Sequence, residues 1–325
     1  MTERIFYLKS TDEDHKLFCV EWYEETIPQR AVLQIAHGMT EHIKRYQTFG
    51  RAMAKLGIIV VGHDHLGHGK SVKNIGEHGH FHDKDGKKHL LMDMEKIGHY
   101  IEKKYVGLPR FLLGHSMGSF CTRAYLRMYG KNHLDGIILM GSGDVPFSQT
   151  LAGQKLVQIL KLKYGIYHRS PFVESILFHD YTKGISPLHT KKDWLSRDED
   201  VVQKYLADPS CNFLFTLGAY GDFLGILELS AKTLDARHIP LDLPIFIISG
   251  EEDPVGAWGR GVKKLYETYQ KTGFSDVEMI LYEGARHEIL NETNKEEVFS
   301  DVAGWILRRV SEISLTNLEK QTKLD

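Results

Sequence analysis

The sequence contains little cysteine and almost no excess charge. Its three cysteines, Cys19, Cys121 and Cys211, are an odd number at distant positions among 325 residues. That excludes a disulfide framework and fits buried, reduced thiols in a cytoplasmic protein. The 41 basic and 43 acidic residues leave a net charge of −2. So small a charge creates no field that would gather a polyanion, and no nucleic-acid partner is expected.

Long apolar runs are also missing. No window reaches the roughly 18 consecutive apolar residues that a membrane-spanning helix needs. The first residues, MTERIFYLKSTDEDHK, lack the apolar centre of a signal peptide. No transmembrane segment is therefore expected. Internal repeats and low-complexity segments are absent too, and the length suits one large domain or a domain that carries an insertion.

The sequence is rich in short apolar runs that alternate with amphipathic segments. An amphipathic helix is expected after most of these runs, and the uniformly apolar strands indicate a mostly parallel sheet with helices on both faces. The first 27 residues alternate like a pair of strands, which we expect to be antiparallel and to lie at one edge. The runs that predict the remaining strands are 31–38, 58–64, 110–116, 134–143, 243–253 and 276–287.

This alternation stops between residues 144 and 240. The segment contains helical patterns, loops with proline and the apolar run CNFLFTLGAYGDFLGIL. Nearly 100 residues between two strands are too many for a loop. We therefore expect a core formed by 1–143 and 241–325, with 144–240 inserted as a helical cap over the carboxyl ends of the strands, where such sheets bind ligands.

Gly114-His115-Ser116-Met117-Gly118 carries the strongest chemical signal. The pattern GxSxG alone is weak, but here the serine stands where a buried strand runs directly into a helix. That setting is typical of a nucleophile elbow. The start of the helix favours the negative charge that develops during attack. Ser116 is therefore the predicted nucleophile, and the alternative is a serine that only caps a helix.

A serine nucleophile needs a base and an acid that orients the base. After an elbow of this kind the acid and then the histidine follow in chain order, each at the end of a strand. Asp253 lies just past the apolar part of the run 243–253 and is the predicted acid. Glu251 and Glu252 are expected to be solvated. His287 follows the last strand and is the predicted base.

The oxyanion formed in such a reaction needs two backbone N–H donors. Met117, the residue after the nucleophile, should supply one. The loop after the strand at 31–38 should supply the other, which makes Met39 the candidate. His37 and Gly38 would shape that loop, and Gly38 would allow close approach of the backbone. The alternative for Met39 is a plain apolar loop residue.

These residues resemble the α/β-hydrolase superfamily, and more closely its monoacylglycerol lipase and lysophospholipase branch, which is grouped with S33-type serine aminopeptidases. The resemblance covers about 1–143 and 241–310. It implies an eight-stranded sheet and the triad and oxyanion roles given above. It rests on HGMTEH with Arg45-Tyr46, on HDHLGHGKS (63–71), on the elbow and on the segments around Asp253 and His287.

The stretch GHDHLGHGKS (62–71) also invites two other interpretations. A metallo-β-lactamase-type site would need Asp where Gly67 stands, and no distant ligand set matches. A phosphate-binding loop would need Gly where Asp64 stands. We expect scaffold in which Asp64 and His65 brace the floor of the site, and no metal. The second group, His78, His80 and His82, is expected to be a solvated loop.

The combined hypothesis is a cytoplasmic serine carboxylic-ester hydrolase that works through an acyl-enzyme without a cofactor. Its expected partner is a small ester with an acyl chain, because the cap is apolar and members of the family take monoacylglycerols or lysophospholipids. A peptidase, thioesterase or acyltransferase could use the same triad. A non-catalytic binding protein of this fold is the remaining alternative. The sequence leaves the oligomeric state open.

Overall fold

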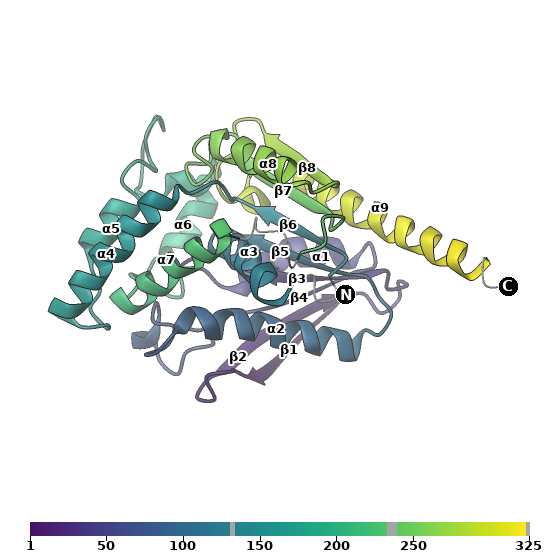
Figure 1. Ribbon diagram of the computed structural model, residues 1–325, viewed down its shortest axis with the longest axis horizontal. Coiled ribbons are helices and arrows are strands. Elements are labelled where there is room, and N and C mark those ends of the chain that lie inside the picture. Colours follow the sequence, from purple (N-terminus) through teal and green to yellow (C-terminus); the bar gives the residue numbers. More distant parts are fainter. Residues whose placement is uncertain (131–133, 233–238, 323–325) are drawn as a thin grey trace.

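A computed structural model of the chain describes residues 1–130, 134–232 and 239–322. Parts of both predicted units lie outside these residues, namely 233–238 of the expected cap and 131–133 and 323–325 of the expected core. The described part contains a single eight-stranded sheet in the order β1-β2-β4-β3-β5-β6-β7-β8 (Figure 1). The strands are β1 Thr2–Lys9, β2 Lys16–Tyr23, β3 Ala31–Ala36, β4 Ile58–His63, β5 Arg110–His115, β6 Gly136–Met140, β7 Ile245–Gly250 and β8 Val277–Tyr282.

The sheet is antiparallel only at one edge. β1 pairs antiparallel with β2, and β2 pairs antiparallel with β4. From β4 to β8 every neighbouring pair is parallel. The predicted edge hairpin and mostly parallel sheet are therefore confirmed. In such a sheet all carboxyl ends point the same way, so residues that follow β3, β5, β7 and β8 gather at one edge.

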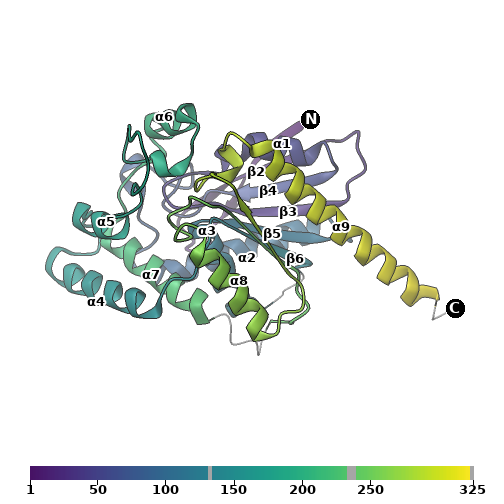
Figure 2. The same ribbon diagram turned by 90° about the horizontal axis from the view of Figure 1, so that it is seen from above.

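Helices cover both faces of the sheet (Figure 2). Because side chains alternate along a strand, Val32 of β3 packs into the cluster that includes α2 and α3, while Leu33 packs into the opposite cluster with α1 and α9. The helices of this layer structure are α1 Gln47–Ala54, α2 Gly86–Lys104, α3 Met117–Tyr129, α8 Arg260–Thr272 and α9 Lys295–Thr322. No helix in the described ranges is both long and apolar enough to cross a bilayer.

The segment between β6 and β7 is helical, as its sequence pattern predicted. It extends to one side of the sheet in Figure 1 and contains α4 Phe147–Tyr164, α5 Pro171–Leu177, α6 Glu199–Ala207 and α7 Leu217–Ala231. Ser170 and Asp198 cap α5 and α6 with their side chains, and Thr216 caps α7 in the same way. Such caps satisfy the free N–H groups of a helix start.

Candidate active site

Ser116 forms the turn between β5 and α3. Its backbone has φ 52° and ψ −120°, a conformation that L-residues adopt rarely and that marks functional turns. The two motif glycines are needed for space. A Cβ on Gly114 would lie 2.3 Å from the carbonyl oxygen of Gly118, and one on Gly118 would lie 2.0 Å from that of Ala36. This sharp turn between a strand and a helix is the backbone geometry that the predicted nucleophile elbow requires.

Asp253 and His287 are paired at the carboxyl edge of the sheet, in the turns after β7 and β8. His287 Nδ1 lies 2.9 Å from each carboxylate oxygen of Asp253. Ser249 Oγ and the Val255 N–H also donate to this carboxylate, each at 2.9 Å. Burial alone would raise the pKa of Asp253, but the charge and hydrogen bond of His287, with these two donors, keep it below its usual value. Asp253 is therefore held as a carboxylate.

The two acids next to Asp253 differ from it in exposure. Glu251 and Glu252 are exposed, as expected, whereas Asp253 is fully buried. The turn after β7 thus directs one of three consecutive acids inward. The path of this turn, and not acidity or nearness to the strand, distinguishes the residue that contacts the histidine.

Ser116 and His287 line the same cavity, which has a volume of about 910 Å³. The ring of His287 lies against that of His115, the residue before Ser116, with centroids 4.8 Å apart. Among the described residues no hydrogen bond joins the Ser116 hydroxyl to the His287 ring. Such contacts are commonly long without substrate and shorten when it binds. Since Nδ1 faces Asp253, Nε2 is the nitrogen that remains for a serine proton.

The loop after β3 lies beside the elbow. A Cβ added to Gly38 would lie only 3.1 Å from the Cβ of Ser116. In the described part of the chain, neither the N–H of Met39 nor that of Met117 donates a hydrogen bond. Both residues line the cavity that contains Ser116. Two unused backbone donors near a serine are what an oxyanion would require.

His37 fixes the shape of this loop. Its Nδ1 donates to the Gly38 carbonyl at 2.8 Å, and its Nε2 accepts the His65 N–H at 2.9 Å. Burial and the neighbouring histidines lower the pKa of His37 well below its usual value, so the ring is neutral and can accept. The predicted support by His37, Gly38 and His65 is consistent with these bonds.

The Glu41 side chain holds the loop after β3 through hydrogen bonds. The sequence interpretation gave this residue no role. Its Oε1 accepts the Gly38 N–H at 2.6 Å, the Tyr46 hydroxyl at 2.9 Å and His115 Nδ1 at 3.0 Å. Burial would raise the pKa of Glu41, but His115 and Arg45 hold it well below its usual value. Glu41 belongs to the quoted motif HGMTEH, yet only the fold reveals that it meets the elbow.

Arg45 extends this network to the loop of the base. Its two terminal nitrogens donate to the two carboxylate oxygens of Glu288 at 2.6 Å each, and Nη1 also reaches Glu41 at 3.1 Å. A bidentate pair of this kind fixes both partners in orientation. Glu288 adjoins His287, so one ion network joins the loop after β3 to the predicted base.

The helical segment between β6 and β7 also contacts the predicted base. His287 N–H donates to the Trp194 carbonyl at 3.3 Å, and Glu288 N–H donates to that of Leu195 at 2.7 Å. The Trp194 ring centroid lies 5.0 Å from that of His287. Nothing in the local sequence around 193–195 signalled this contact, because it joins residues that lie more than 90 positions apart in the chain.

Asp64 makes the stretch 62–71 a scaffold. Its carboxylate oxygens accept the N–H groups of Ile43 and Lys70, each at 2.7 Å, and its carbonyl accepts from Ser71 Oγ at 2.6 Å. Burial raises the pKa of Asp64 to about 6. The loop after β4 is therefore closed by its own side chains and tied to the start of the segment that leads into α1.

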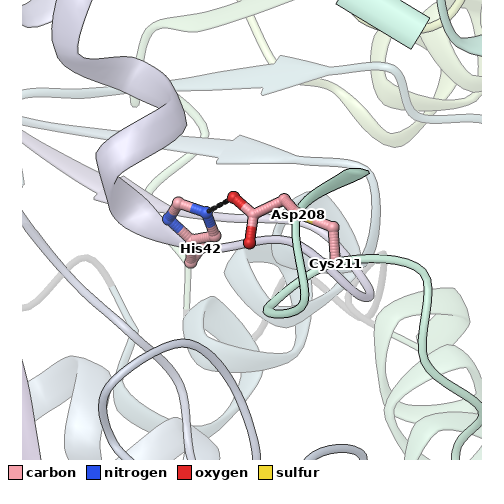
Figure 3. Close-up of side chains that lie close together, drawn as sticks. All are labelled: His42, Asp208 and Cys211. Carbon is pink, nitrogen blue, oxygen red and sulfur yellow. Dashed lines mark hydrogen bonds and ion pairs between the residues drawn. The ribbon is translucent and has the colours of Figure 1, made fainter. Parts of the chain in front are cut away.

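The histidines of this stretch pack against one another. The ring centroids of His63 and His65 are 4.8 Å apart, and those of His65 and His68 are 6.3 Å apart. Among the described residues, the group whose ligand atoms converge within 4.8 Å lies elsewhere and consists of His42, Asp208 and Cys211 (Figure 3). It is separate from the cavity around Ser116, which Asp208 and Cys211 do not line.

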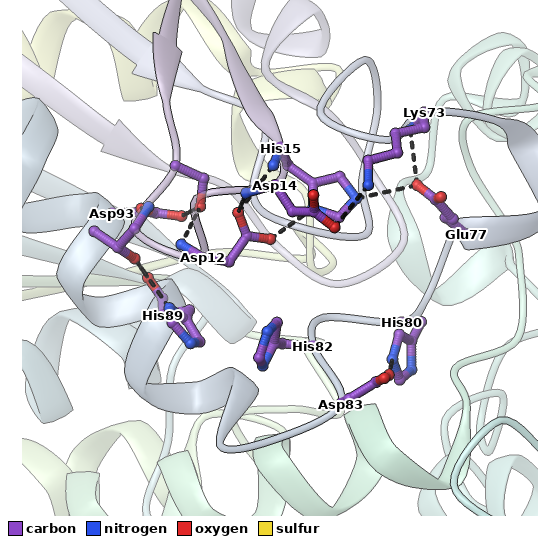
Figure 4. Close-up of polar contacts among 12 residues, drawn as sticks. Asp12, Asp14, His15, Lys73, Glu77, His80, His82, Asp83, His89 and Asp93 are labelled. Atoms are coloured by element: carbon purple, nitrogen blue, oxygen red, sulfur yellow. Dashed lines mark hydrogen bonds and ion pairs between the residues drawn. The ribbon is translucent and has the colours of Figure 1, made fainter.

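The second histidine group, at 78–82, is only partly a solvated loop, so that expectation was wrong for His78. Its ring is buried and stacks on Phe213 with centroids 4.9 Å apart. The sequence could not indicate this contact, since Phe213 belongs to the insertion. His80 and His82 are half-buried, and His80 Nε2 lies 3.0 Å from Asp83 (Figure 4).

Comparison with known proteins places the chain in a family. The model of the family described as serine aminopeptidase, S33, matches residues 27–294. The chain belongs to this family. It is 28% identical to a monoglyceride lipase homolog of Monkeypox virus, over 92% of the chain and 96% of the relative. It is 27% identical to a monoacylglycerol lipase of Mycolicibacterium smegmatis, over 88% and 91%.

A solved esterase structure supports the fold. A thermostable carboxyl esterase from Bacillus coagulans, crystallised in complex with glycerol, superposes with a TM-score of 0.87 at 27% identity, over 95% of this chain and 99% of that one. The resemblance stated from the motifs is therefore confirmed. This S33 family member has the α/β-hydrolase fold and is a hydrolase.

Proposed function

We propose that the protein is a serine ester hydrolase that cleaves lipid-like monoesters through an acyl-enzyme. The observation that carries the proposal is the pairing of His287 Nδ1 with Asp253, in the cavity onto which the strained Ser116 opens. Ser116 Oγ would attack the ester carbonyl while His287 Nε2 takes its proton. His287 would then protonate the leaving alcohol, and water would release the acid by the same steps.

The roles of the remaining site residues follow from the same chemistry. The N–H groups of Met39 and Met117 would bind the oxyanion, because they line the cavity without another acceptor among the described residues. Asp253 would hold the imidazole in one tautomer and stabilise its charged form. His37 and Gly38 would maintain the loop that presents Met39.

The substrate class is argued from the cavity. A volume of about 910 Å³ is at the large end of ligand sites, and an acyl chain would bury apolar surface there. The relatives named above are a monoglyceride lipase homolog and a monoacylglycerol lipase, and the related esterase was crystallised in complex with glycerol. The apolar lining comes from four helices and includes Phe120, Leu156, Ile176, Leu177, Phe223, Leu224 and Leu227.

We also propose that the two units expected from the sequence have different functions. Residues 1–143 and 241–325 would form the catalytic core, and 144–240 would form a cap that covers the cavity. Support comes from the lining, since residues of α4, α5 and α7 face the same space as Ser116 and His287. A cytoplasmic site of action is part of the proposal, supported by three buried free cysteines.

A peptidase is the second candidate, because the family model is named for an aminopeptidase. Esters of p-nitrophenol with increasing acyl length and aminoacyl p-nitroanilides separate the two. We expect ester cleavage to dominate and to increase with acyl length. A preference for the anilides would contradict the ester assignment. Transfer of the acyl group to added thiols or alcohols, in place of water, would instead indicate an acyltransferase.

A fluorophosphonate probe tests the mechanism itself. Wild-type protein should be labelled at Ser116, and Ser116→Ala should be neither labelled nor active. Ser119→Ala is the matched control, because Ser119 lies on the same helix and its hydroxyl donates to the Ser116 carbonyl. Folded wild type without labelling would support a binding protein. Equal labelling of Ser116→Ala would refute the assigned nucleophile.

A further inference from the structure

A cluster of three ligand-type side chains lies outside the proposed catalytic centre. His42 belongs to the loop after β3, and Asp208 and Cys211 belong to the segment between α6 and α7 (Figure 3). His42 Nε2 lies 2.9 Å from Asp208 Oδ2. With the Cys211 sulfur, the ligand atoms all lie within 4.8 Å of one another. Three different donor types from two separate segments thus meet at one point.

We propose that His42, Asp208 and Cys211 form a binding site for a divalent transition metal of the zinc class. Imidazole nitrogen, carboxylate oxygen and thiolate sulfur are the ligands that zinc prefers. Binding would form a metal–sulfur bond and release the thiol proton to solvent. The thiolate and the carboxylate would then balance the two positive charges of the ion, and a water would complete a tetrahedron.

The distances require only small side-chain movements. In a tetrahedral zinc site the donor atoms are about 3.3–3.5 Å apart, given metal–ligand bonds of about 2.0–2.3 Å. The His42–Asp208 pair at 2.9 Å would open by about 0.5 Å. The widest separation, within 4.8 Å, would close by about 1 Å. Rotation of the side chains is sufficient for both changes.

The site is ordered and reachable. Asp208 Oδ1 accepts the Ser210 N–H at 2.8 Å, and the Asp208 carbonyl accepts the Cys211 N–H at 2.9 Å. These bonds turn Oδ2 toward His42, as partners around a metal commonly do. The Asp208 side chain is 34% exposed and that of His42 is 15% exposed. An ion can therefore enter from solvent while Cys211 lies buried behind them.

Arg45 does not oppose binding. Burial raises the pKa of the Cys211 thiol, and the positive charge of Arg45 acts in the opposite direction. Its guanidinium is already occupied by Glu288, at 2.6 Å for both nitrogens, and by Glu41 at 3.1 Å. Because two carboxylates neutralise this arginine, little of its charge reaches an ion at Cys211.

A bound metal would fasten the insertion to the loop after β3. The two segments already meet through Thr40, whose hydroxyl lies 2.6 Å from that of Tyr205 and whose carbonyl accepts the Asn212 N–H at 3.3 Å. Met39 precedes Thr40 in this loop. Metal binding would therefore restrict the same loop that lies beside Ser116, and it would stabilise the folded chain by mass action.

Titration of the full chain tests the site without any activity measurement. After treatment with a chelator, zinc binding is measured by calorimetry, and cobalt binding by the sulfur-to-metal charge-transfer absorption. We expect one equivalent of either ion and a zinc-dependent rise in Tm. Cys211→Ala should abolish the cobalt–sulfur absorption and weaken zinc binding by about tenfold or more. Cys121→Ala, which removes another buried thiol, should change neither.

Two further variants keep the test decisive if Cys211→Ala does not fold. His42→Gln and Asp208→Asn should each weaken zinc binding by a similar factor, whereas His179→Gln, an exposed histidine, should not. The proposal is overturned if wild type binds no zinc, or if Cys211→Ala binds it as tightly as wild type. Fluorophosphonate labelling of Ser116 is measured in parallel, so failure of the metal site and failure of the hydrolase assignment are distinguished.

Discussion

His287 Nδ1 lies at the same distance, 2.9 Å, from both carboxylate oxygens of Asp253. The carboxylate therefore holds the ring in a single tautomer, with Nδ1 protonated and Nε2 free to accept a proton. Burial would favour a neutral acid, yet the histidine and two further donors keep Asp253 charged. The pair is the part of the site on which the rate should depend most.

Asp253→Asn should lower kcat by about 10⁴-fold while the fold is retained. The amide would stabilise the wrong imidazole tautomer, since its NH₂ donates where the carboxylate accepts. Ester hydrolysis and circular dichroism measure the two properties. Glu252→Gln, which changes an exposed acid next to it, should keep wild-type kcat. A loss below tenfold for Asp253→Asn would refute its role.

Glu41→Gln should lower kcat by about 10–100-fold with a smaller effect on KM. The amide cannot satisfy Gly38 N–H, Tyr46 and His115 together, and a loop displaced by about 1 Å costs roughly this much rate. The free energy of unfolding should also fall, by about 1–3 kcal/mol. Kinetics on a soluble ester and urea unfolding measure both. An equal change in kcat for Glu251→Gln, which alters an exposed acid, would contradict the role assigned to Glu41.

Gly118→Ala should destabilise the protein by about 3 kcal/mol or more. Its Cβ would lie 2.0 Å from the Ala36 carbonyl oxygen, and neither backbone segment can move freely. Gly304→Ala is the matched control, because it lies exposed within α9 with no neighbour within 4 Å. That change should instead stabilise by about 0.5–1 kcal/mol. Urea unfolding measures the change in the free energy of unfolding for both variants. Equal changes would contradict the prediction.

Leu224→Trp should shift the ester preference toward short acyl chains. Leu224 of α7 lines the cavity, and its side chain lies where a Cβ added to Gly153 of α4 would meet it. A larger side chain would fill the space that a long chain needs. We expect kcat/KM to fall about tenfold for long esters and to stay unchanged for acetyl esters. Leu162→Trp, on the exposed side of α4, should leave the profile as it is.

The free energy of unfolding should decrease as the pH falls below about 6.5. Burial lowers the pKa of His65 to about 4 and that of His68 to about 3, so the unfolded chain binds protons first. Asp64, with a pKa raised to about 6, opposes this between about 4 and 6. Two histidines outweigh one acid. His68→Phe should reduce the slope by up to about 1.4 kcal/mol per pH unit, measured by urea unfolding between pH 4.5 and 7.

The sheet and its site edge could be predicted because their signals are local. Apolar runs mark the strands, and parallel topology brings the turns that follow three of them, with Ser116, Asp253 and His287, to one edge of the sheet. The antiparallel edge could likewise be predicted, from the alternation of apolar and polar residues in the first 27 residues. The assigned roles of these residues remain predictions that the variants above would test.

The remaining contacts could not be predicted because they join distant segments. Glu41 meets His115 across 74 positions in the sequence, and Arg45 meets Glu288 across 243. His78 was expected in solvent, but Phe213 covers it. Periodicity along the sequence does not indicate such pairs, because each pair depends on how the loops and the segment between β6 and β7 are placed relative to the sheet.

The contacts of the insertion with the base limit how this protein can be recombined with its relatives. Trp194 and Leu195 bind the backbone of His287 and Glu288, and Arg286 donates to the carbonyls of Asp193 and Ser196. A chimera that exchanges the whole insertion would exchange this support as well. Substrate preference should therefore transfer without loss of rate only when the graft boundaries leave 193–196 with the host.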